Sequence, residues 1–143
     1  MDHATQNIDD YLADGSDGAL AASDGANSVI FDPAPLSELQ SVLSAEQVGA
    51  LAESYCQTVE TALANLDQAA AANDLAALGE YGHDLKSNAG SFGASRLQHL
   101  AGQLEYCARE GQHNAALALL PAIHAAAGAA DGEIRAHLSG TKG

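Results

Sequence analysis

The stretch Leu75–Phe92, LAALGEYGHDLKSNAGSF, carries the clearest helical pattern in the chain. At ~100° of rotation per residue, its apolar and small residues fall on one stripe: Leu75, Leu78, Gly82, Leu85, Ala89 and Phe92. Such a stripe predicts an amphipathic helix that packs one face on a core. Asn73 and Asp74 precede the stretch as candidate caps, and Gly93 follows it as a break. We therefore expect a helix from Asp74 to Phe92.

One histidine of this helix lies away from the apolar stripe. His83 falls about 140° from the centre of the stripe, so its imidazole is expected to point outward or to lie at the margin of the core. The long side chains beside it on the helix surface are Glu80 at i−3 and Lys86 at i+3. The other neighbours at helical spacing are small: Gly79, Ser87 and Gly90. A cation one turn from an exposed imidazole is well placed to neutralise an anion held there.

The glycines of this helix have two interpretations. Gly79, Gly82 and Gly90 each cost about 0.8–1 kcal/mol relative to alanine inside a helix. The chain has 32 alanines in all, so packing alone does not call for these glycines. In the first interpretation, the small side chains leave an open surface around His83. A partner protein docks on this surface, at Gly79, Glu80, Ser87 and Gly90. Alternatively, the glycines let two helices approach closely.

Helical patterns continue on both sides of this stretch. A capping box, Ser44-Ala45-Glu46-Gln47, opens the longest pattern, and Pro121 either kinks the last one or marks its true start. The flanking patterns span residues 36–43, 44–72, 97–111 and 114–138. Connections this short favour antiparallel neighbours. The sequence predicts an all-α fold over residues 33–143, an antiparallel up-down four-helix bundle with a short extra N-terminal helix.

The charge of the chain is unevenly distributed. Five Lys and Arg residues oppose 19 Asp and Glu residues, for a formal net charge of −14. Residues 1–32 hold seven of the acids and no Lys or Arg, which predicts a flexible acidic tail outside the bundle. The acidic balance argues against nucleic acid and anionic membrane surfaces as partners. We find no run of about 18 apolar residues that would span a membrane.

Two cysteines are present, Cys56 and Cys107, each near an apolar stripe of a different predicted helix. A secreted disulfide scaffold would be richer in cysteine. The sequence therefore predicts two reduced, half-buried thiols in a cytoplasmic protein.

Residues 83–94, HDLKSNAGSFGA, resemble the signature of the histidine-containing phosphotransfer (HPt) domain family. That signature reads His-x-Leu-Lys-Gly, then small residues, an apolar residue and Gly-Ala. The residues in register with it are His83, Leu85, Lys86, Phe92, Gly93 and Ala94. Ser87 stands where the family usually has glycine, and the resemblance extends over about residues 36–138.

The resemblance implies a role for three side chains. His83 would accept a phosphoryl group on Nε2 from an aspartyl phosphate of a receiver domain, as in bacterial-type two-component signalling, and Lys86 would stabilise the added charge. Members of the family place a Gln or Glu opposite the histidine to orient it. An antiparallel hairpin that turns near Gly93 puts residue 104 or 105 opposite residue 83, so Glu105 is the candidate that holds Nδ1.

The family also implies the partners. The phosphoryl group would come from the receiver domain of a hybrid histidine kinase and pass to a response regulator, and the chain would act as a monomer without kinase activity of its own. No cofactor or metal is expected on this chain, because the magnesium ion belongs to the partner receiver. Two other classes stay open: a non-catalytic helical adaptor or inhibitor that binds receiver or kinase domains, and a hydrolase with His83 as base. No Ser or Cys nucleophile with an orienting acid supports the hydrolase.

Overall fold

The computed structural model describes residues 29–142, and this part of the chain is helical without a strand. The predicted all-α class is therefore confirmed. The helices are α3 (Ala34–Val42), α4 (Ala45–Ala71), α5 (Leu75–Ser91), α6 (Ser95–Arg109), α7 (His113–Ala118) and α8 (Leu120–Lys142). The expectation of a flexible acidic tail falls mostly on residues 1–28, which lie outside the described residues.

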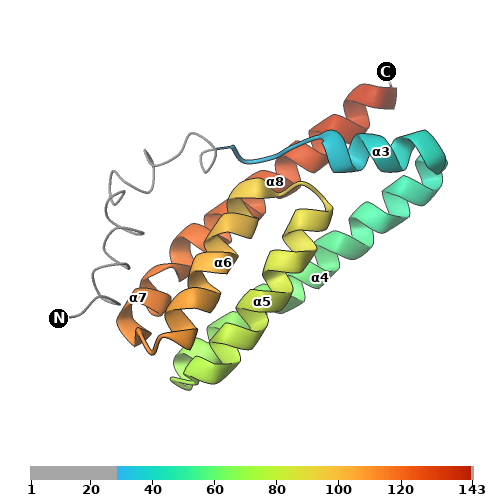
Figure 1. The fold of residues 1–143 in the computed structure, drawn as a ribbon. Coiled ribbons are helices and arrows are strands. Elements are labelled where there is room, and N and C mark those ends of the chain that lie inside the picture. The colour runs from blue at the N-terminus through green and yellow to red at the C-terminus, as the bar shows by residue number, and fades with distance from the viewer. Residues whose placement is uncertain (1–28, 143) are drawn as a thin grey trace.

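Four long helices form the bundle. Helix α5 packs between α4 and α6, and α8 closes the bundle against both α4 and α6 (Figure 1). The short helix α3 leads into α4, and the short helix α7 connects α6 to α8. The arrangement agrees with the predicted up-down bundle and its extra N-terminal helix.

Leucine and small residues fill the core. The apolar stripe of α5 points inward: Leu78, Gly82, Leu85 and Ala89 are buried. The largest fully buried side chains are mostly leucines from all layers of the bundle, among them Leu36, Leu66, Leu97, Leu100 and Leu104. One aromatic pair joins α4 to the end of α5, because the Tyr55 and Phe92 rings stack at 4.7 Å. Thus α5 is fixed on its inner face, and its outer face is left for other contacts.

The helix ends follow the capping signals. Ser44 and Gln47 form the predicted capping box, and Asp74 accepts a hydrogen bond from the backbone N–H of Ala77 at 3.0 Å. Gly93 ends the turn after α5 with a φ of +79°, a conformation that glycine adopts without strain. Pro121 lies in the first turn of α8, where a missing N–H is tolerated, so it marks a true start and the predicted helix 114–138 is two helices.

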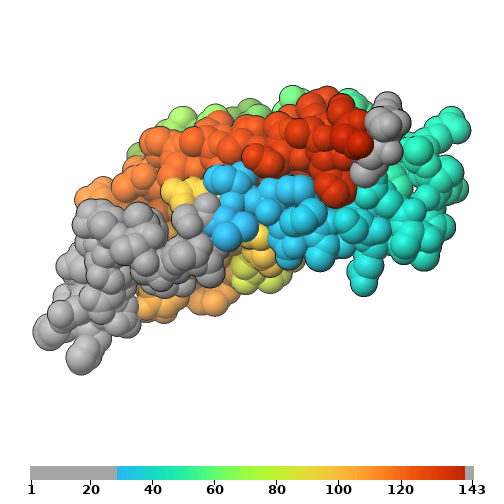
Figure 2. Space-filling view, turned by 90° about the horizontal axis from the view of Figure 1, so that it is seen from above, coloured from blue at the N-terminus to red at the C-terminus, as the bar shows by residue number. Residues whose placement is uncertain are grey.

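The bundle begins earlier than residue 33. The backbone N–H of Asp32 donates to the carbonyl oxygen of Gly93 at 2.7 Å, and Ile30 and Phe31 pack on the core. The ring of Phe31 meets that of His137 on α8 edge-on, with centroids 5.9 Å apart. Figure 2 shows this segment and α3 lying alongside α8 on one face of the molecule. The predicted tail boundary is therefore wrong for residues 30–32, because apolar side chains anchor them.

The segment His113–Gly140, which covers α7 and most of α8, is long and apolar enough to cross a membrane by length and composition alone. This differs from the sequence analysis, which predicted no apolar run long enough to span a membrane. The stretch is weak evidence for a membrane span, because a core helix passes the same test. Its buried residues Ile123, Ala130 and Ile134 belong to the bundle core.

Candidate functional site

Helices α5 and α6 pack against each other in one antiparallel register, set by the turn at Gly93. Four levels along the hairpin show this register: Gly79 with Ala108, His83 with Glu105, Lys86 with Gly102, and Gly90 with Gln98. At three of the four levels one of the two residues is glycine, so the helices come close together. The remaining level joins His83 to Glu105.

His83 is held by one nitrogen and exposed at the other. Its Nδ1 lies 2.9 Å from Oε2 of Glu105, and 59% of its side chain is exposed. A carboxylate can only accept, so Nδ1 carries the proton and donates it. The neutral ring then has its lone pair on Nε2, which makes no hydrogen bond to another residue within 29–142. The predictions that His83 points outward and that Glu105 lies opposite it are confirmed.

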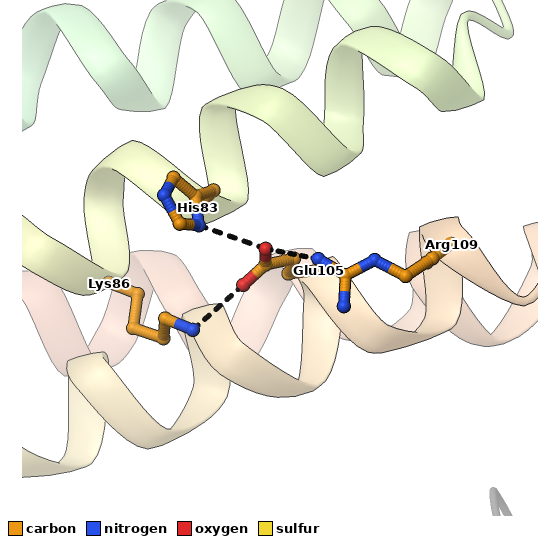
Figure 3. A network of polar contacts seen from close by, with 4 residues as sticks. All are labelled: His83, Lys86, Glu105 and Arg109. Atoms are coloured by element: carbon orange, nitrogen blue, oxygen red, sulfur yellow. Dashed lines mark hydrogen bonds and ion pairs between the residues drawn. The ribbon is translucent and has the colours of Figure 1, made fainter.

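Glu105 is the centre of a small polar network (Figure 3). Its side chain is only 10% exposed, and Lys86 Nζ lies 2.9 Å from Oε1. On the other side, Nη2 of Arg109 donates to Oε2 at 2.5 Å. The hydrogen bond from Lys86, and then the one from His83, hold the pKa of Glu105 below its ordinary value although burial opposes them. Glu105 is therefore an ionised acceptor that donors from both helices hold in place.

Arg109 was missed by the sequence analysis. It follows Glu105 by four residues on α6, and this spacing puts the two side chains on one helix face. That spacing was the available signal. It carries little weight alone, because exposed pairs of this kind are common and contribute little to stability.

The structure corrects the interpretation of the glycines. A Cβ on Gly79 would lie 3.1 Å from the Cβ of Ala108, and one on Gly82 would lie 3.3 Å from the carbonyl oxygen of Ala101. A Cβ at either position would force a neighbour to shift by a few tenths of an ångström, so the packing of α5 on α6 favours both glycines, contrary to the expectation that packing did not call for them. A Cβ on Gly90 would meet only the end of the flexible Gln98 side chain.

The surface around His83 remains open. A pocket of about 540 Å³ lies beside the imidazole between α5 and α6. Its lining includes Gly79, Glu80, His83, Asp84, Glu105 and Arg109. Glu80 and Ser87 are exposed, and Gly90 is partly exposed. The docking role of Gly79, Glu80, Ser87 and Gly90 stays a prediction.

The family model of the Hpt domain matches residues 50–137, which is more than half of the chain. The chain belongs to the Hpt domain family. The matched region contains the whole α5–α6 hairpin with His83, Lys86 and Glu105. Membership gives this Hpt domain a histidine phosphotransfer role in a phosphorelay, the role of an intermediate rather than of a classical kinase.

A solved structure has the same fold. The crystal structure of histidine-containing phosphotransfer protein B (HptB) from Pseudomonas aeruginosa PAO1 matches with a TM-score of 0.72 and 24% sequence identity. The match covers 77% of this chain and 95% of that chain. At this identity the likeness supports the helical architecture of the Hpt domain. No curated protein matches the chain.

Proposed function

We propose that His83 is the phosphoacceptor of this Hpt domain and that it exchanges a phosphoryl group with receiver domains. The lone pair of Nε2 attacks phosphorus, a nitrogen–phosphorus bond forms, and the bond from phosphorus to the aspartyl oxygen breaks. The aspartate leaves as a carboxylate. In the second half of the relay the same steps run in reverse, onto an aspartate of a response regulator.

One observation carries this proposal: the 2.9 Å contact between Nδ1 of His83 and Oε2 of Glu105. It holds the proton on Nδ1, so the exposed Nε2 is the nucleophilic nitrogen. The ring becomes positively charged as Nε2 bonds to phosphorus. Because Glu105 is ionised and nearly buried, it stabilises this charge more than it stabilises the neutral ring. Glu105 is thus a positioning residue that favours the transition state.

Lys86 and Arg109 supply positive charge near the site where the negatively charged phosphoryl group arrives. The two cations share one carboxylate, so the network carries one positive charge in excess while His83 is neutral. In our proposal the Lys86 ammonium, 39% exposed on a flexible stem, turns from Glu105 to the incoming phosphoryl oxygens. Arg109 then keeps Glu105 paired.

The partner in this proposal docks over the outer face of α5. Gly79, Glu80, Ser87 and Gly90 surround His83 there, and the pocket beside the imidazole admits side chains of the partner. We place the magnesium ion of the reaction on the receiver domain, and we expect the Hpt domain to work as a monomer in the cytoplasm.

The test is transfer from a phosphorylated receiver domain. The chain is incubated with the phosphorylated receiver. Phosphate transferred to the chain is then tested for stability in base and loss in acid. His83→Gln is expected to abolish the label. His124→Gln is the matched control, because His124 is also exposed and paired with a carboxylate, but its Nε2 is occupied by Asp67 at 3.0 Å. The absence of label on the native chain would support the adaptor alternative instead.

A further inference from the structure

Lys86 lies on a glycine of the neighbouring helix. Gly102 belongs to α6 and precedes Glu105 by three residues, so both lie on the face of α6 toward α5. A Cβ at position 102 would lie 3.3 Å from Cδ of Lys86, which is closer than an ordinary side-chain contact. The hydrogen atom of Gly102 leaves just enough room for the lysine stem.

This contact decides where the ammonium goes. Only two bonds separate Cδ of Lys86 from Nζ, and Nζ lies 2.9 Å from Oε1 of Glu105. A lysine side chain with four free torsions has many rotamers in water, and ordering it costs entropy. Packing of the stem on Gly102 removes rotamers that point away from both Glu105 and the neighbouring His83. The flat surface of α6 therefore directs Lys86 to Glu105.

The backbone conformation of the helix does not require a glycine at position 102. Its φ does not lie in the left-handed region, which within 29–142 is occupied among glycines by Gly93 and Gly111. Apart from the neighbouring residues and backbone of its own helix, Lys86 provides the sole atom within 4 Å of the added Cβ among the described residues. Alanine would be the better helix former at this position. The sequence therefore departs from the preferred helix-forming residue at a position beside the polar network around Glu105.

We infer that Gly102 is a positioning residue of the phosphotransfer site, which sets the reach of Lys86 to Glu105 and to the phosphoryl group. The part that concerns the phosphoryl group rests on the proposed function. The part that concerns Glu105 does not, because it is a property of the unphosphorylated chain.

The experiment uses Gly102→Ala and Gly102→Leu in the full chain, with Gly49→Leu as the matched control. Gly49 is also helical, and a Cβ there meets nothing within 4 Å. The first readout is the pH titration of the Glu105 carboxyl carbon by NMR. Lys86 is the largest cause of the lowered pKa of Glu105, so this pKa is expected to rise in Gly102→Leu and less in Gly102→Ala.

The second readout is a double-mutant cycle on the rate of phosphoryl transfer. Gly102→Leu and Lys86→Ala are each expected to slow transfer about tenfold, the effect of one lost charge-assisted hydrogen bond. If Gly102 acts through Lys86, Gly102→Leu causes no further loss in the Lys86→Ala background. The Gly49→Leu control is expected to transfer at the native rate.

The outcomes separate the two proposals. An unchanged Glu105 titration in folded Gly102→Leu overturns the role of Gly102, and so do additive losses in the cycle. If the leucine variant does not fold, the titration of Gly102→Ala decides in the same way. A shifted titration in a chain whose His83 takes up no phosphate overturns the proposed function and leaves the positioning of Lys86 standing.

Discussion

Removal of the Glu105 carboxylate tests how His83 is activated. In Glu105→Ala, Nδ1 loses the acceptor that lies 2.9 Å away at a position with 10% side-chain exposure. A hydrogen bond to a charged group is worth roughly 1.5–3 kcal/mol, and each 1.36 kcal/mol changes a rate tenfold. Transfer from a phosphorylated receiver to His83 is therefore expected to slow about ten- to hundredfold. Glu105→Gln, which keeps an acceptor oxygen without the charge, is expected to be intermediate.

The assay is rapid-quench measurement of phosphate on the chain after mixing with the phosphorylated receiver. Asp67→Ala is the matched control, because it removes the carboxylate partner of another exposed histidine, His124. Circular dichroism of each variant confirms that the bundle is intact. Native transfer rates in folded Glu105→Ala would refute the role given to the Nδ1 hydrogen bond.

Three further predictions concern stability and reactivity. Because the pKa of Glu105 is lowered in the folded chain, its carboxylate stabilises the fold at pH values above 4.5, the ordinary pKa of a glutamate. The difference in urea stability between the native chain and Glu105→Gln should therefore shrink as the pH falls below 4.5. Gly93→Ala should lose more than about 2 kcal/mol in urea unfolding, since its Cβ would collide with the Asp32 carbonyl oxygen, whereas Gly111→Ala, with a similar φ of +74° in open space, should lose only about 1 kcal/mol. Burial and a hydrogen bond to Asp131 raise the pKa of Cys56 to about 12, so iodoacetamide at pH 8 should modify it slowly in the folded chain and faster in urea; rapid modification of the folded chain would contradict this.

The sequence was sufficient for the parts of the fold that periodicity and capping control. The inward stripe of α5 and the capping box at Ser44 depend on neighbours three or four residues away, and both lie where they were expected. The position of Glu105 opposite His83 followed from one turn, at Gly93, because two straight antiparallel helices keep a constant register.

Features that depend on contacts between distant segments were harder to predict. Packing of Ile30 and Phe31 on the bundle involves α8, more than 100 residues later, and nothing in the local sequence shows it. The glycines at 79 and 82 were interpreted from one helix, although their reason lies in Ala108 and Ala101 on the next. The close approach of α5 and α6 is known only once the positions of both helices are known.

The central claim is that phosphate is carried on Nε2 of His83 while Nδ1 keeps its proton for Glu105. NMR of the phosphorylated chain with ¹⁵N-labelled histidine measures both at once. The account predicts phosphorus coupling to Nε2 of His83 and a protonated Nδ1. Phosphorus coupled to Nδ1, or attached to any other residue, would contradict it.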